Sequence, residues 1–166
     1  MFKNALTEKI VEFLKEIGLE IEPRSLDKET FLPGILIENG KICVDEEKLA
    51  FPGDLLHEAG HLAVVPGDLR GQLSDEVELP DFFPDTIEAA AMAWSYAAAL
   101  YLEIDPRIVF HKEGYKGNSA ALLQNFTLGA YIGVNELEEA KMTRTGENAM
   151  KSGTSAYPKM IKWLRD

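Results

Sequence analysis

The sequence is poor in cysteine and histidine, and it has fewer basic than acidic residues. Cys43 is the only cysteine among 166 residues, which excludes an intramolecular disulfide and a zinc site made of thiolates. A reducing, cytoplasmic location is the simplest expectation. The 17 Lys+Arg against 28 Asp+Glu give a formal net charge of −11. Because nucleic acids and anionic membranes attract basic surfaces, we expect neither as a partner.

Long apolar runs are also missing. Lysines and glutamates are spread through the first 20 residues, which leaves no room for the apolar core of a signal peptide. The longest uncharged runs are residues 89–102, too short to span a bilayer, and residues 117–135, which contain amides and glycines. A chain of 166 residues suits one domain, so we expect a single domain over residues 1–166 and no membrane segment.

Local patterns in the first quarter predict a helix followed by strands. Apolar residues at helical spacing indicate an amphipathic helix over residues 6–17, with Gly18 ending it. Residues 19–22 alternate apolar and acidic and suggest a short strand. Two β-rich runs, residues 35–38 and 41–44, flank Asn39-Gly40, the dipeptide most typical of a type I′ hairpin turn.

The rest of the sequence is mainly helical in pattern. Asp54 is the expected N-cap of a helix over residues 55–65, which Pro66-Gly67 ends. An acidic stretch, residues 67–85, is typical of a long loop that is functional or poorly ordered. Further helices are expected near residues 85–103, 119–131, 136–142 and 156–164. The predicted fold class is α+β, mainly helical, with a small N-terminal antiparallel sheet or hairpin.

The helix expected at residues 55–65 carries the motif His57-Glu58-Ala59-Gly60-His61. Residues at i and i+4 lie on one face of a helix, so His57 and His61 can bind one Zn²⁺ ion. Glu58 would stand beside the metal as general base and take a proton from an activated water. The alternative is a pair of ordinary helix histidines. The chain has only three histidines, however, and the apolar flanks would bury two unligated imidazoles at a cost.

A catalytic zinc site needs a third protein ligand. We favour Glu88, because it stands near the start of a helix that is otherwise apolar and rich in alanine. Alternatively, Glu88 only stabilises the helix, because a negative charge in the first turn interacts favourably with the positive end of the helix dipole. The full set of downstream candidates is His111, Asp75, Glu76, Asp85 and Glu88.

An HExxH helix followed by a glutamate on a second helix resembles the gluzincin metallopeptidases. More narrowly, the layout over about residues 35–102 resembles the ImmA/IrrE-type family, whose members cleave repressor-like regulators. That family's second helix has a Glu-x-x-Ala-Asn-x-Phe-Ala-like pattern; here Glu88 and Ala91 match, Trp94 is an aromatic substitute, and Met92 stands where Asn is expected. The resemblance implies a zincin-like fold whose edge strand holds an extended peptide. Residues 35–38 or 41–44 would form that edge, or the hairpin would only cover the core.

A peptidase also needs a donor for the developing oxyanion, and His111 and Tyr115 are the candidates, with His111 the preferred catalytic residue. The leading hypothesis is a zinc-dependent peptidase that uses a metal-activated water, with Glu58 as general base and a peptide or protein as substrate. A second hypothesis is a catalytically weak regulatory or protein-binding module on the same scaffold. A third is a hydrolase of non-peptide amides.

Overall fold

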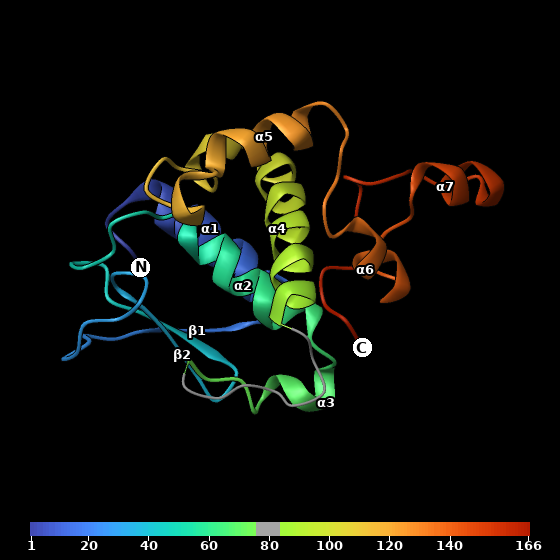
Figure 1. The fold of residues 1–166 in the computed structure, drawn as a ribbon. Helices are drawn as coiled ribbons and strands as arrows, with labels where there is room; N and C mark the ends of the chain where they lie inside the picture. The colour runs from blue at the N-terminus through green and yellow to red at the C-terminus, as the bar shows by residue number, and fades with distance from the viewer. Residues whose placement is uncertain (76–83) are drawn as a thin grey trace.

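The computed structural model describes residues 1–75 and 84–166 and has an α+β fold, as predicted (Figure 1). One small sheet lies to one side of the helices. Within the described ranges the α-helices are α1 (Ala5–Glu16), α2 (Asp54–Val64), α3 (Gly67–Arg70), α4 (Pro84–Tyr101), α5 (Ser119–Thr127), α6 (Val134–Glu139) and α7 (Gly146–Ser152), with 3₁₀ turns η1 (Pro106–Ile108) and η2 (Tyr115–Gly117). None of the described helices is both long and apolar enough to cross a membrane.

Helix α1 forms where the apolar spacing predicted it. The side chain of Asn4 caps its start by accepting hydrogen bonds from the backbone N–H groups of Leu6 and Thr7, at 2.9 and 3.2 Å. Gly18, with φ of 101°, follows its end in a conformation that favours glycine. The apolar face of α1 is buried, and the helix packs against both β1 and α2.

The sheet contains β1 (Glu20–Pro23), β2 (Ile35–Glu38) and β3 (Lys41–Val44) in the order β1-β3-β2. The β2–β3 hairpin is confirmed, and Asn39 and Gly40 in its turn have φ of 50° and 76°. The prediction of a wholly antiparallel sheet is wrong, because β1 pairs with β3 in parallel. Strand β3 has the most completely buried side chains of the three, and a strand in the middle of a sheet pairs on both sides.

Helices α2 and α4 cross closely and form the centre of the core (Figure 1). Gly60 permits this approach, because a Cβ atom there would lie 2.8 Å from the carbonyl oxygen of Ala91. Trp94 is fully buried in the same core, and its indole N–H donates to the carbonyl of Trp163 at 2.9 Å. The close crossing brings together the predicted metal ligands of the two helices, His57, His61 and Glu88.

Several predicted boundaries are wrong. Gly53 is the N-cap residue of α2 and Asp54 is its first residue, so Asp54 does not cap the helix. Helix α3 occupies the start of the acidic stretch that the sequence predicts to be a loop. The helices predicted at residues 119–131 and 136–142 end earlier, at Thr127 and Glu139.

The helix predicted near residues 156–164 does not form. Pro158 cannot donate a helix hydrogen bond, and this part of the chain is irregular. Its end is attached to α2 instead: the N–H of Arg165 donates to the carbonyl of Ala63 at 2.9 Å. Helix α7, in contrast, has no counterpart among the predicted elements.

Candidate metal centre

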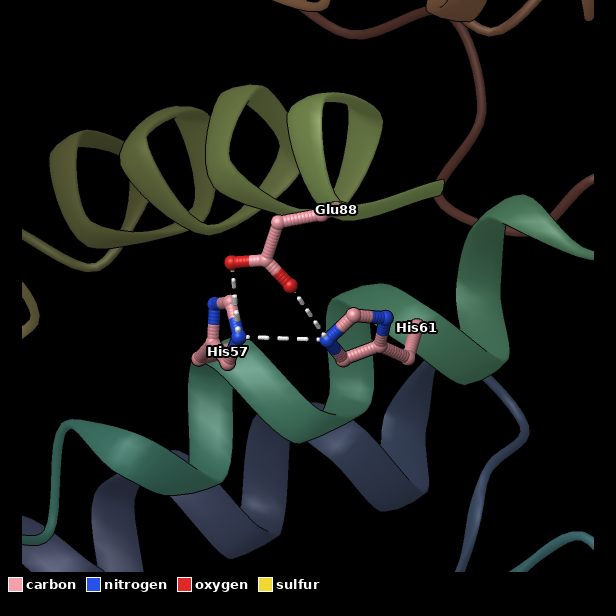
Figure 2. A group of neighbouring side chains, drawn as sticks. All are labelled: His57, His61 and Glu88. Atoms are coloured by element: carbon pink, nitrogen blue, oxygen red, sulfur yellow. Dashed lines mark hydrogen bonds and ion pairs between the residues drawn. The ribbon is translucent and has the colours of Figure 1, made fainter. Parts of the chain in front are cut away.

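Three side chains converge between α2 and α4, and they are the three predicted metal ligands (Figure 2). The Nε2 atoms of His57 and His61 are 3.1 Å apart. Glu88 faces them from near the start of α4, with Oε1 3.5 Å from Nε2 of His57 and Oε2 3.2 Å from Nε2 of His61. One turn of α2 separates the histidines, so the helix itself sets their spacing.

These separations fit a tetrahedral zinc ion. Zinc binds imidazole nitrogen and carboxylate oxygen at about 2.0–2.2 Å, so two ligand atoms at tetrahedral corners lie about 3.4 Å apart. The three observed separations, 3.1, 3.2 and 3.5 Å, surround that value. Two imidazoles with one carboxylate also suit zinc better than calcium or magnesium, which prefer sites made of oxygen atoms. The three residues therefore fit a zinc ion in donor type, number and spacing.

The pKa values of these side chains depend on one another. Burial disfavours a charged imidazole at His57, but the hydrogen bond and negative charge of Glu88 outweigh this and raise its pKa. Burial also works against a charged Glu88, yet its hydrogen bonds to His57 and His61 lower its pKa far below the usual range. Glu88 is thus an anion at neutral pH and can contribute negative charge to a bound cation.

The second ring nitrogen of His57, Nδ1, contacts a tyrosine hydroxyl on the side away from Glu88 and His61. Nδ1 of His57 lies 3.1 Å from the hydroxyl of Tyr115. Burial and the negative charges of Glu88, Asp54 and Glu58 raise the pKa of this hydroxyl far above its usual range, so Tyr115 is neutral. A phenolic oxygen can accept a hydrogen bond from an Nδ1–H of His57. This arrangement favours the tautomer in which the Nε2 lone pair faces the metal position.

Tyr115 is placed by an unusual backbone. Tyr115 and Lys116 have φ of 54° and 53°, in the left-handed region, and Gly117 follows with φ of 82°. Two consecutive residues other than glycine in this region carry a conformational cost. The sequence suggests Tyr115 as an oxyanion donor, and the structure places its hydroxyl against Nδ1 of His57; the oxyanion role of Tyr115 stays a prediction.

Glu58 lines the same cleft, but its carboxylate is not one of the three converging ligands. Burial raises the pKa of Glu58, and the negative charges of Asp75 and Glu88 raise it further. A carboxylate with a raised pKa is a better proton acceptor than an ordinary surface glutamate. This position and pKa suit the role of general base that the motif predicted.

His111 lies in the cleft wall and not among the ligands. Its Nε2 is 2.8 Å from Oδ1 of Asp54, which is buried, and its ring stacks on Phe51 with centroids 3.9 Å apart. Burial raises the pKa of Asp54, against the effect of its hydrogen bond with His111. The sequence gives no sign of this pairing, because the two residues are 57 positions apart and neither belongs to a motif. The oxyanion role of His111 stays a prediction.

The cleft around these residues has a volume of about 1410 Å³. Two other proposed ligands, Asp75 and Asp85, line it without joining the converging group, and Glu76 lies outside the described residues. Ile35 and Ile37 of β2 form part of its wall. Of the two strands that the resemblance implies as a substrate edge, only β2 is at an edge, since β3 is central.

Comparison of the chain with protein-family models, curated proteins and solved structures finds no match. Function is therefore inferred from the chemistry of this cleft: three convergent ligands, a glutamate with a raised pKa beside them, and a sheet edge along the wall.

Proposed function

We propose that this protein is a zinc-dependent peptidase with His57, His61 and Glu88 as the metal ligands and Glu58 as the general base. The observation that carries the proposal is the convergence of three ligand atoms at 3.1–3.5 Å from one another in an open cleft. Three protein ligands leave a fourth position for water or substrate, as in catalytic zinc sites. The resemblance to the ImmA/IrrE-type family, carried by the same residues, supports the same activity.

In the proposed hydrolysis the three ligands hold the zinc ion and Glu58 transfers the proton. Zinc, when held by the three ligands, would polarise the scissile carbonyl and make a water acidic enough to attack at neutral pH. Glu58 takes a proton from the attacking water onto its carboxylate. It then gives this proton to the nitrogen of the breaking C–N bond, so that an amine and a carboxylic acid form, and the acid ionises by losing its remaining proton to the solvent. The raised pKa of Glu58 helps the first transfer, because it makes the carboxylate a better proton acceptor. The second transfer is driven by the leaving nitrogen, which is far more basic than a carboxylate.

Two further features support a peptide substrate. The cleft, at about 1410 Å³, is larger than the roughly 300–1,000 Å³ typical of small-molecule sites. A strand edge in the wall of this cleft can align an extended main chain.

The test compares the wild-type protein with Glu58→Gln, which keeps the size and polarity of the side chain but cannot accept the proton. Both proteins are loaded with zinc and incubated with a peptide pool from a digested proteome, and new N-termini are counted by mass spectrometry. We expect cleavages with the wild type, and loss of cleavage with full zinc retention in Glu58→Gln. Equal cleavage by the two proteins would contradict the assigned base. Bound zinc without any cleavage would favour the alternative, a regulatory module on this scaffold.

A further inference from the structure

The outer edge of β2 has a defined set of groups available for pairing. In a hairpin with a two-residue turn, Glu38 and Lys41 form the first hydrogen-bonded pair, and hydrogen-bonded and non-hydrogen-bonded pairs then alternate. The backbone groups of Leu36 and Glu38 therefore face β3. Those of Ile35 and Ile37 face outward, on the side that lines the cleft, where the Ile35 N–H donates to the Leu32 carbonyl at 3.1 Å.

The chain itself occupies this edge. Asp75 makes two hydrogen bonds to Ile37: its Oδ1 accepts from the Ile37 N–H at 2.9 Å, and its own N–H donates to the Ile37 carbonyl at 3.1 Å. The Ser74 hydroxyl accepts from the Asn39 N–H at 2.9 Å. The Leu73 carbonyl accepts from the Gly40 N–H at 2.8 Å. We call residues 73–75 the strap.

The strap makes only part of the main-chain hydrogen bonds that an added β-strand would make with β2. A true antiparallel neighbour would give Ile37 one main-chain donor and one main-chain acceptor. The strap supplies the donor from its backbone, but the acceptors for Ile37 and Asn39 come from the side chains of Asp75 and Ser74. Asp75 is exposed, so water can compete for its bonds. A peptide that offers main-chain groups at these positions could replace the strap without leaving β2 unpaired.

The strap also lies in the same cleft as the predicted general base and metal ligands. Asp75 and Ser74 line the same cleft as Glu58 and the two histidines, and the charge of Asp75 is close enough to influence Glu58. A peptide on the outer edge of β2 would thus run along the wall of the candidate metal centre. The acidic side chains of Asp75, Asp85 and Glu113 in that cleft favour a peptide with basic side chains.

We propose that the strap competes in cis for the outer edge of β2 with the extended peptide that the resemblance implies for this edge, and that peptide binding displaces it. The inference deepens the proposed function and rests on it for the identity of the bound chain as substrate. It assigns the strap a regulatory role: it competes in cis with substrate and favours peptides long enough to pair with Ile37.

The test uses two substitutions that differ at one hydrogen bond. Asp75→Ala removes the side-chain acceptor, whereas Asp75→Asn removes the charge but keeps an oxygen that can accept from Ile37. Both are made in the Glu58→Gln background so that nothing is cleaved. The probe is the blocked, strand-forming, cationic peptide acetyl-Lys-Thr-Val-Thr-Val-Thr-Lys-amide, and binding is followed by the amide NMR signals of Ile37 and Asn39.

We expect Asp75→Ala to bind the probe about fivefold more tightly than Asp75→Asn, as the loss of one competing hydrogen bond predicts. The signals of Ile37 and Asn39 should shift on binding. Ser74→Ala, which removes the other side-chain acceptor, should act in the same direction as Asp75→Ala. Equal affinity of the two Asp75 variants, shifts confined to other parts of the protein, or no binding by any variant would overturn the inference.

Failure of the inference and failure of the proposed function are distinguishable in the same samples. Probe binding to β2 needs no metal, so it is measured before and after zinc is added. A protein that binds the probe as expected but takes up no zinc would contradict the peptidase proposal alone. A protein that holds zinc and shows no difference between Asp75→Ala and Asp75→Asn would contradict the strap alone.

Discussion

Gly60→Ala tests whether the close crossing of α2 and α4 builds the candidate metal centre. The new Cβ would lie 2.8 Å from the Ala91 carbonyl oxygen and 3.0 Å from its Cα. Ordinary contacts begin at 3.4 Å, so the helices must separate by up to about 0.6 Å. Glu88 is three residues from Ala91 on α4, and the same movement would carry its carboxylate away from the histidines.

Two opposing effects set the magnitude. Alanine in a helix interior gains up to about 1 kcal/mol over glycine, whereas overpacking a core costs about 1–3 kcal/mol. We therefore expect Gly60→Ala to lower the free energy of unfolding by about 0–3 kcal/mol. Zinc affinity should fall more clearly, by at least about tenfold, because metal ligands tolerate only small displacements.

Gly146→Ala is the matched control, since nothing lies within 4 Å of the position that its new Cβ would take and its φ is not positive. Stability is measured by urea unfolding of the metal-free proteins, and zinc affinity by competition with a chromophoric chelator. The control should be neutral or slightly stabilising and should bind zinc as the wild type does. If Gly60→Ala matches the control in both measurements, the explanation by close helix packing is wrong.

The remaining predictions concern the surroundings of the ligands. Tyr115→Phe should weaken zinc binding about 10–100-fold, because it removes the hydroxyl that contacts Nδ1 of His57. The control, Tyr101→Phe, alters an exposed residue and should leave zinc binding unchanged. Competition with a chelator measures the zinc affinity of both variants. Because the pKa of His57 is raised, the stabilisation from its protonated form is present below about pH 6.5 and is lost as the pH rises through that raised value. Zinc must displace this proton from His57, so zinc should bind more tightly and release fewer protons as the pH rises. Calorimetry in buffers of different ionisation enthalpy measures both quantities. A zinc affinity that does not change with pH would contradict the assignment of His57 as a ligand. Arg70→Ala should destabilise the protein by about 1–3 kcal/mol in urea unfolding, because Arg70 donates to the carbonyls of Leu62 and Arg165 at 2.8 and 2.7 Å; Arg107→Ala, at an exposed pair, should change little.

The parts of the site that lie close in sequence could be predicted. The spacing of His57 and His61 is fixed by one helical turn, and the Asn39-Gly40 turn determines its hairpin through local backbone preference. Glu88 could be predicted because a carboxylate is conspicuous in an alanine-rich helix. In each case a short-range rule was enough.

The remaining features depend on contacts between distant segments. Nothing local to residues 20–23 distinguishes parallel from antiparallel pairing, so the direction of β1 could be seen only in the assembled sheet. The pairing of His111 with Asp54 and the contact of Tyr115 with His57 likewise join residues more than 50 positions apart. The strap was hidden for the same reason, since the sequence indicates Asp75 only as a candidate metal ligand.

Zinc content is the most direct test of the central claim. Elemental analysis of the purified protein, with X-ray absorption at the zinc edge, reports both stoichiometry and ligands. We predict one zinc per chain, bound by two imidazole nitrogens and carboxylate oxygen, and loss of that zinc in His57→Ala and in Glu88→Ala. A folded wild-type protein that takes up no zinc, or zinc that stays in place in both variants, would contradict the claim.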